Sequence, residues 1–141
     1  MITGSAGFIG FHLAQTFLSK KWKVVGFDAM TNYYDVSLKI DRHSILENNP
    51  DFFSYKGLLQ DPNLLNEVYE CHKPNIIIHL AAQAGVRYSI DNPISYVESN
   101  LIGTFHILEL SRKYKPEHLL MASTSSVYGS NKDMPLHENQ K

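Results

Sequence analysis

Three glycines spaced three residues apart lie near the beginning of the sequence, within Thr3-Gly4-Ser5-Ala6-Gly7-Phe8-Ile9-Gly10. Met1 and Ile2 precede them, and a run with apolar residues at helical spacing follows from Gly10 to Phe17. The pattern predicts a strand, a tight turn and a helix whose first N–H groups are free to bind an anion. Glycine lets a phosphate approach where a Cβ atom would block it. A tight turn without a ligand is the alternative interpretation.

An acidic residue stands at the distance from this turn that a nucleotide site would need. Lys23-Val24-Val25-Gly26-Phe27 is typical of a short buried strand, and Asp28 ends it, 18 residues after Gly10. Dinucleotide-binding folds place a carboxylate about 20 residues after the glycine-rich turn, where it accepts hydrogen bonds from the adenosine ribose. The two features together predict a bound dinucleotide, with its diphosphate on the turn and its ribose on Asp28.

Asp28 also indicates which dinucleotide is bound. A 2′-phosphate beside this carboxylate would meet like charge, a repulsion of about 4 kcal/mol at an effective dielectric constant of about 20. The next four residues, Ala29-Met30-Thr31-Asn32, contain no arginine or lysine that would offset it. The sequence therefore favours NAD over NADP.

Later segments would reach the same edge of the fold. Leu80-Ala81-Ala82-Gln83-Ala84-Gly85 is small enough for close approach of a ribose and a nicotinamide, with a plain buried turn as the alternative. Arg87 could grip a phosphate or carboxylate of a substrate or lie at the surface. Asn100 interrupts an apolar helix face, and because a buried amide needs partners, we expect it to tie two loops together. Direct contact of Asn100 with the cofactor is the second interpretation.

Four consecutive hydroxyl residues, Ser123-Thr124-Ser125-Ser126, follow the last apolar segment of the chain. A hydroxyl at the end of a strand can donate a hydrogen bond to a sugar oxygen and strengthen it as charge develops there. Serines also fill ordinary turns, so both interpretations stay open.

Alternating strand and helix patterns must position these residues. We expect strands over 1–3, 23–28, 52–56, 75–80 and 118–122, and helices over 7–20, 36–46, 62–72 and 93–114, with a loop over 81–91. Asp35 and Asp61-Pro62 are predicted to start the second and third helices. Strictly alternating elements predict an α/β fold, a Rossmann-like doubly wound parallel sheet with both faces covered. The expected strand order is 3-2-1-4-5, with a ligand crevice at the carboxyl ends of strands 1 and 4. The first strand is short for a central one, and we expect residues in front of it.

Composition narrows the class of protein. The 141 residues carry a net charge of −1 and are 43% hydrophobic and 19% charged, as in an ordinary globular domain. Neither a basic excess nor a long apolar run is present, so we expect no nucleic-acid partner, no membrane insertion and no signal peptide. A single cysteine, Cys71, fits a reducing cytoplasm. The seven histidines lack ligand spacing, and no metal is predicted.

Several of these motifs together resemble those of the extended short-chain dehydrogenase/reductases. They are Thr-Gly-x-x-Gly-Phe-Ile-Gly at 3–10, Asp28, His-Leu-Ala-Ala-Gln-Ala-Gly-Val-Arg-Tyr-Ser at 79–89 and Ser-Thr-Ser-Ser-Val-Tyr-Gly at 123–129. Within that family the sequence is most similar to nucleotide-sugar epimerases, particularly the UDP-glucuronate 4-epimerases of capsular polysaccharide synthesis. The stretch Asn-Tyr-Tyr-Asp-Val-Ser-Leu-Lys at 32–39 fits this subgroup.

The resemblance implies residue roles. The residues that would bind NAD are Gly4, Gly7, Phe8, Ile9 and Gly10 at the diphosphate, Asp28 at the ribose, and Asn32, Leu58, Leu59, Leu80, Ala81, Ala82 and Asn100 elsewhere along the cofactor. Many relatives have an acidic residue where Leu58 stands. The UDP-sugar substrate would be contacted by Arg87, Thr124, Ser125 and Ser126, with Thr124 as the catalytic hydroxyl that assists a tyrosine.

The resemblance also implies a reaction and a limit. NAD⁺ would take hydride from C4 of the sugar and return it to the other face of the 4-keto intermediate. Related dehydratases carry Asp-Glu after the threonine, and the decarboxylases keep a Glu there, because their chemistry needs carboxyl groups. Ser125 and Ser126 stand there instead, which favours epimerisation.

The family's Tyr-x-x-x-Lys pair would follow residue 141, as would the substrate-binding half. We therefore expect residues 1–141 to be the NAD-binding domain alone, without turnover. A non-catalytic NAD-binding module and a UDP-galactose 4-epimerase are the alternatives. Relatives form homodimers through helices that include the one at 93–114.

Overall fold

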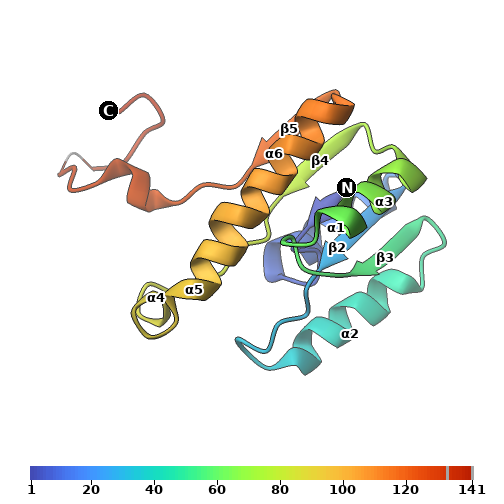
Figure 1. Cartoon of the computed structure of the whole chain (residues 1–141), viewed down its shortest axis with the longest axis horizontal. Coiled ribbons are helices and arrows are strands. Elements are labelled where there is room, and N and C mark those ends of the chain that lie inside the picture. The colour runs from blue at the N-terminus through green and yellow to red at the C-terminus, as the bar shows by residue number, and fades with distance from the viewer. Residues whose placement is uncertain (133, 141) are drawn as a thin grey trace.

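A five-stranded parallel sheet forms the centre of the molecule in a computed structural model, which describes residues 1–132 and 134–140 (Figure 1). The strands are β1 (Ile2–Thr3), β2 (Val24–Asp28), β3 (Phe52–Lys56), β4 (Ile76–His79) and β5 (His118–Met121). Their order is β3-β2-β1-β4-β5, and every neighbouring pair is parallel. The predicted Rossmann-like fold and strand order are confirmed.

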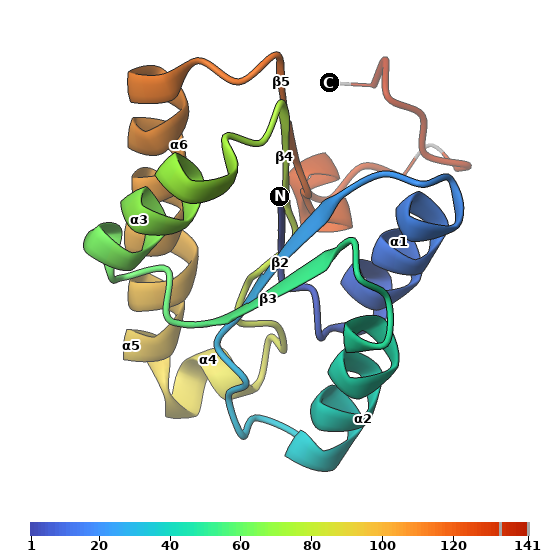
Figure 2. The ribbon, with the colours of Figure 1, turned by 90° about the vertical axis from the view of Figure 1, so that its right-hand side faces the viewer.

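Helices cover the two faces of the sheet. Helices α1 (Phe8–Ser19) and α2 (Val36–Glu47) lie on one face, and α3 (Pro62–His72), α5 (Pro93–Tyr96) and α6 (Gly103–Tyr114) lie on the other (Figure 2). Two aspartates start α2 and α3 as predicted. Asp35 accepts a hydrogen bond from the Ser37 N–H at 2.9 Å, and Asp61 accepts one from the Asn63 N–H at 3.0 Å. These carboxylates satisfy N–H groups that have no partner within the helix.

Each face of the sheet has its own apolar core, because successive side chains of a strand point to opposite sides. On the α1–α2 face, Val24 and Ile78 pack with Leu18 and Leu46. Val25 and Ile77, the strand neighbours of Val24 and Ile78, point to the other face. The core on that face, between the sheet and helices α3 and α6, contains Val25, Phe27, Leu65, Val68, Ile77 and Ile107. The continuous apolar runs of β2 and β4 thus serve two cores at once.

Two predicted segments between β4 and β5 differ from the structure. The predicted loop 81–91 contains a short helix, α4 (Tyr88–Asp91). The predicted single helix 93–114 is divided, because a π-helical segment, η1 (Val97–Ile102), separates α5 from α6. Its wider turn coincides with two hydrogen bonds between Asn100 and Gln83 in the preceding loop, one accepted and one donated by the Asn100 side chain. Val97 and Leu101 are exposed, so the apolar helix face predicted around Asn100 is not an interior one.

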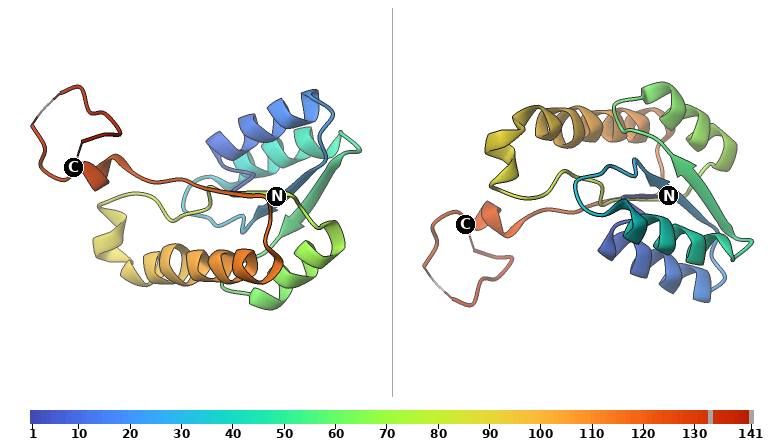
Figure 3. Two further views of the ribbon diagram at one scale, coloured as in Figure 1. Left: turned by 90° about the horizontal axis from the view of Figure 1, so that it is seen from above. Right: turned by 90° about the horizontal axis from the view of Figure 1, so that it is seen from below.

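The far edge of the sheet is uncovered, which corrects the expectation of a sheet buried throughout. In β5, Leu120 is 49% exposed and Met121 is 39% exposed. The chain then leaves the sheet, forms a 3₁₀ turn, η2 (Ser125–Tyr128), and extends away from the helices (Figures 1 and 3). In the part of the chain that the structure describes, no helix is long and apolar enough to cross a membrane.

Candidate functional site

A crevice of about 290 Å³ lies at the carboxyl ends of β1, β2 and β4, where the strand order predicts it. Eight of the predicted cofactor residues line it, namely Gly4, Gly7, Asp28, Leu58, Leu59, Leu80, Ala81 and Ala82. The structure adds residues that the local patterns missed, among them Tyr34, Lys39, Ser95 and Glu98.

The glycine-rich turn has the geometry of an anion site. Gly4 has a φ of +73°, and a Cβ atom there would lie 2.9 Å from the backbone nitrogen of Ala81. A Cβ atom on Gly10 would lie 2.1 Å from the carbonyl oxygen of Gly4, so this glycine lets α1 pack on the turn. Gly7 caps α1 without any side-chain hydrogen bond. The first N–H groups of α1, on Phe8 and Ile9, are therefore available to a ligand, while their side chains are exposed.

The Asp28 carboxylate is held in place next to this turn. It is 6% exposed; its Oδ2 accepts from the Ala6 N–H at 3.0 Å and its Oδ1 from the Met30 N–H at 2.9 Å. A carboxylate oxygen can accept more than one hydrogen bond, so both oxygens keep capacity for the two hydroxyls of a ribose. The orientation of Asp28 is set by backbone groups on both sides of it.

A lysine absent from the predicted set lies beside Asp28. The Nζ atom of Lys39, on α2, is 3.9 Å from Asp28 Oδ1, and both side chains are 8% exposed. Residues 29–32 contain no cation, but the packing of α2 brings Lys39 to the site from further along the chain. The Asp35 cap fixes the phase of α2 and could have revealed that Lys39, Arg42 and His43 share one face.

The other two residues of this α2 face also contact the turn. Arg42 donates to the carbonyl oxygen of Ala6 at 3.1 Å. The two ring nitrogens of His43 lie 3.0 Å from Ser5 Oγ and 3.2 Å from Ser54 Oγ. Burial lowers the pKa of His43, against the opposing charges of Asp28 and Glu47. A neutral His43 thus links the turn to β3.

A second histidine joins the turn to β4. Thr3 Oγ1 accepts from the N–H groups of Leu80 and Ala81, both at 3.2 Å, and lies 2.7 Å from His79 Nδ1. Having accepted twice, the hydroxyl donates its one proton to Nδ1, so His79 carries its proton on Nε2 and donates to Thr104 Oγ1 at 3.0 Å. Burial lowers the pKa of His79, in keeping with this neutral form.

Asn100 ties one loop to the helical segment η1, rather than joining two loops as expected. Its Oδ1 accepts from the Gln83 N–H at 2.7 Å, and its Nδ2 donates to the Gln83 carbonyl at 3.0 Å. Asn100 does not line the crevice, and neither does the exposed Asn32. Asn100 therefore positions the backbone of Gln83, next to the crevice residues at 80–82, and does not itself line the crevice.

The predicted substrate residues lie outside the crevice. Arg87 is exposed next to α4. Thr124 caps η2 by accepting from the Ser126 N–H at 3.3 Å, and Ser125 and Ser126 are exposed on the segment that leaves the sheet. The structure does not bring these four residues together with the glycine-rich turn.

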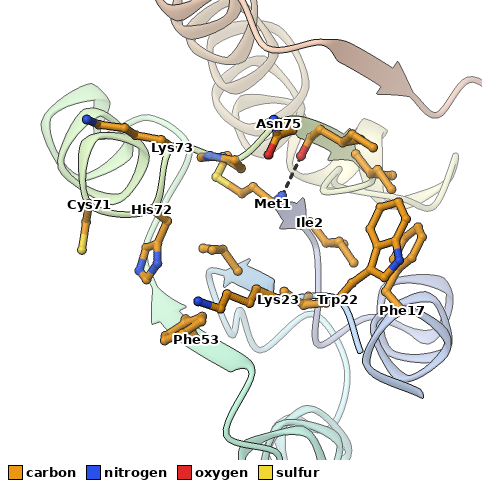
Figure 4. Close-up of a pocket in the computed structure, with 15 residues that line it drawn as sticks. Met1, Ile2, Phe17, Trp22, Lys23, Phe53, Cys71, His72, Lys73 and Asn75 are labelled. Atoms are coloured by element: carbon orange, nitrogen blue, oxygen red, sulfur yellow. Dashed lines mark hydrogen bonds between the residues drawn. The ribbon is translucent and has the colours of Figure 1, made fainter. Parts of the chain in front are cut away.

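A larger cavity of about 370 Å³ lies at the opposite, amino ends of the strands (Figure 4). Its walls are mainly apolar and include Ile2, Val24 and the stacked rings of Phe17 and Trp22. The Met1 amine donates to the Ile76 carbonyl at 2.7 Å, and burial lowers its pKa to about 5. This cavity lacks a glycine-rich helix start and a paired carboxylate, so the smaller crevice is the candidate site.

Comparison with known proteins identifies relatives. Residues 1–141 match the family described as GDP-mannose 4,6 dehydratase. The chain is 51% identical over 138 residues to a probable UDP-glucuronate 4-epimerase of Rhizobium meliloti (strain 1021), covering 98% of this chain and 40% of that protein. It is 46% identical over 136 residues to protein CapI of Staphylococcus aureus, covering 96% of this chain and 40% of that protein.

Solved structures share the fold. The UDP-glucuronic acid 4-epimerase of Bacillus cereus, in complex with UDP-glucuronic acid and NAD, superimposes with a TM-score of 0.88 at 32% identity, over 99% of this chain and 44% of that one. A dTDP-glucose 4,6-dehydratase of Bacillus anthracis in complex with NAD superimposes at 0.81 and 29% identity, over 99% and 42% of the two chains. The chain thus spans less than half the length of these relatives.

Proposed function

The chain belongs to the GDP-mannose 4,6 dehydratase family, and on that premise we propose that residues 1–141 are the NAD-binding domain of a nucleotide-sugar 4-epimerase that acts on UDP-glucuronate. The observation that carries this proposal is the crevice, in which the Asp28 carboxylate stands beside a helix start with free N–H groups. The Rhizobium meliloti relative supports the substrate, and the Bacillus cereus structure, in complex with UDP-glucuronic acid and NAD, supports the substrate and the cofactor.

The residues of this chain would hold NAD along the crevice. The N–H groups at Phe8, Ile9 and Gly10 would bind the diphosphate, and Asp28 would accept hydrogen bonds from the adenosine ribose hydroxyls. Leu58 and Leu59 would contact the adenine, with Leu58 replacing the acidic residue of many relatives. Residues 80–82, which line the crevice, would border the remainder of the cofactor.

When bound, NAD⁺ supplies the hydride acceptor for oxidation at C4 of the sugar. The protein's part is to position the substrate hydroxyl and to stabilise the oxygen on which charge develops. Thr124 is the hydroxyl we assign to that contact, and in this structure it caps η2 instead. Ser125 and Ser126 carry no ionisable group near neutral pH, which supports epimerisation over the elimination of water.

A homodimer is the proposed assembly. Exposed apolar side chains at helical spacing form a stripe along α5, η1 and α6, which lie end to end in Figure 1. We call it the α5–α6 stripe; it comprises Ile94, Val97, Leu101, Phe105 and Leu108. A contiguous apolar surface of this kind is typical of a protein–protein interface.

The cytoplasm is the proposed location, supported by the single, unpaired Cys71.

Calorimetric titration of the chain with NAD is the first test. We expect saturable binding that Asp28→Asn weakens at least about tenfold, because a charge-assisted hydrogen bond is lost. Incubation of the chain with NAD and UDP-glucuronate is expected to give no epimer. Absence of NAD binding to a folded chain would contradict the proposal.

The substrate is tested in a chimera that joins residues 1–141 to the remaining part of the Rhizobium meliloti relative. We expect it to convert UDP-glucuronate at C4, as followed by proton NMR, with Thr124→Val slowing the conversion. Conversion of UDP-galactose alone would favour the UDP-galactose 4-epimerase. NAD binding without conversion of either sugar would favour a non-catalytic NAD-binding module.

A further inference from the structure

The pair formed by Lys39 and Asp28 is unusual because both members are almost fully buried at the place proposed for the adenosine ribose. Counted over the whole residue, Lys39 is 7% exposed and Asp28 is 6% exposed. Lys39 Nζ lies 3.9 Å from Asp28 Oδ1. Both residues line the crevice. Burial reduces screening by water, so each charge acts strongly on any third charge placed next to the pair.

The ammonium group of Lys39 is held firmly and keeps one donor. It donates to the Thr31 carbonyl at 3.1 Å and to Thr31 Oγ1 at 3.2 Å, and it lies 4.9 Å from the centre of the Tyr34 ring. A lysine has three N–H donors, so one remains. At 3.9 Å, Asp28 attracts this group by charge without a normal hydrogen bond.

A phosphate on the 2′-oxygen of the ribose would meet both charges of the pair. Asp28 would repel it, whereas Lys39, whose Nζ lies 3.9 Å from Asp28 Oδ1, would attract it and could donate its third N–H. Arg42 adds a second cation, with its guanidinium 3.1 Å from the Ala6 carbonyl and 3.4 Å from Tyr34 Oη. The neutral hydroxyl of NAD at that position is far less sensitive to the charge of Lys39.

We propose that Lys39 is a specificity-determining residue of the adenosine end of the site. Its charge offsets the repulsion between Asp28 and a 2′-phosphate, so the chain discriminates against NADP less strongly than Asp28 alone would. The proposal rests on the proposed function, because it takes the crevice to be the NAD site. It predicts the ratio of two dissociation constants, which a purely structural role of Lys39 would leave unchanged.

The test is calorimetric titration of the chain with NAD and with NADP, directly or by competition, in the wild type, Lys39→Met and Lys39→Arg. We expect Lys39→Met to raise the ratio of the NADP to the NAD dissociation constant at least about fivefold, and Lys39→Arg to leave it within about twofold. Lys113→Met, which removes an exposed cation 3.7 Å from Glu70, is the matched control and is expected to leave the ratio unchanged.

A second pair of variants, Asp28→Asn with and without Lys39→Met, keeps the proposal testable if Lys39→Met alone does not fold. Lys39→Met leaves the buried Asp28 without its cation, whereas Asp28→Asn combined with Lys39→Met removes both charges together. We expect Asp28→Asn to bind NADP at least about tenfold more tightly than the wild type, and the double variant to lose most of that gain. Thermal melting verifies the fold of each variant.

The outcomes separate the two proposals. Equal weakening of NAD and NADP by Lys39→Met, together with equal NADP affinity of Asp28→Asn and the double variant, would overturn the role of Lys39 and leave the NAD site standing. A folded wild type that binds neither dinucleotide would instead overturn the proposed function.

Discussion

The hydroxyl of Thr3 lies 2.7 Å from Nδ1 of His79, and the two residues are register partners on the central strands β1 and β4. The same hydroxyl accepts the N–H groups of Leu80 and Ala81. One side chain thus connects the residue before the glycine-rich turn to the segment that borders the other side of the crevice. The relative position of these two segments depends on it.

Replacing Thr3 by valine is expected to lower the free energy of unfolding by about 1–3 kcal/mol, because one buried hydroxyl accepts from two N–H groups and donates to His79. NAD binding should weaken in the same variant. Thr3→Ser, which keeps the hydroxyl, should retain most of both. Urea denaturation gives the free energy. Thr16→Val is the control, since the Thr16 hydroxyl bonds only to the His12 carbonyl at an exposed position, and it should change the free energy by no more than about 0.5 kcal/mol.

Replacing Gly10 by alanine should disrupt the turn. The new Cβ atom would lie 2.1 Å from the Gly4 carbonyl oxygen. The clash is with backbone atoms, which cannot move away without distorting the turn or the start of α1. We expect a loss of at least about 3 kcal/mol in unfolding free energy and a loss of NAD binding. Gly129→Ala is the matched control: its φ is +61°, but nothing lies within 4 Å of the added atom. It should cost about 1–2 kcal/mol and leave NAD binding intact. Equal effects of both substitutions would contradict the role of Gly10.

The stability of a chain that begins at Met1 should rise with pH between about pH 5 and pH 8. Burial lowers the pKa of the Met1 amine from 8.0 to about 5, so in this window the unfolded chain binds a proton that the folded chain does not. The free energy of unfolding then increases with pH, by up to about 4 kcal/mol across the window. The same contribution to stability disappears when the pH is lowered from about 8 to about 5. The lowered pKa values of His43 and His79 add to the same trend below about pH 6.5.

Acetylation of the amino group separates the Met1 contribution. An acetylated chain still donates from its N–H to the Ile76 carbonyl, and the adjoining cavity has room for the acetyl group (Figure 4). Between pH 7 and pH 8, urea denaturation should show a positive slope of the unfolding free energy for the free amine and a flat one for the acetylated chain. Identical slopes would mean that the amine is not the group responsible.

A charge placed on the α5–α6 stripe should weaken the proposed dimer. Leu101 is 68% exposed and Phe105 is 57% exposed, so glutamate at either position is tolerated by the monomer but desolvated in the interface. We expect the dimer dissociation constant to rise at least about tenfold in sedimentation experiments. Ile40→Glu, on an exposed position of α2, is the control and should leave it unchanged. A wild type that sediments as a monomer at all concentrations would refute the dimer.

Local sequence patterns were sufficient for the parts of the site that depend on a few neighbouring residues. The glycine spacing predicted the turn and the start of α1, and Asp35 and Asp61 marked the starts of α2 and α3. Asp28 was found because the distance from a glycine-rich turn to the end of the second strand varies little. In each case the physical cause acts within one turn or one strand–helix unit, and the alternation of such units was enough to predict the order of the sheet.

Tertiary structure alone decided what lies opposite these residues. Lys39 reaches Asp28, and His43 reaches the turn, because α2 packs against α1 and β3. The pairing of Thr3 with His79 joins two strands whose residues are 76 positions apart in the sequence. The division of the helix at η1 coincides with the hydrogen bonds between Asn100 and Gln83, in the loop that precedes the helix. Thr124 lies outside the crevice because the chain after β5 leaves the sheet. Contacts between residues far apart in the chain depend on how whole elements pack against one another. A short stretch of sequence does not determine that packing.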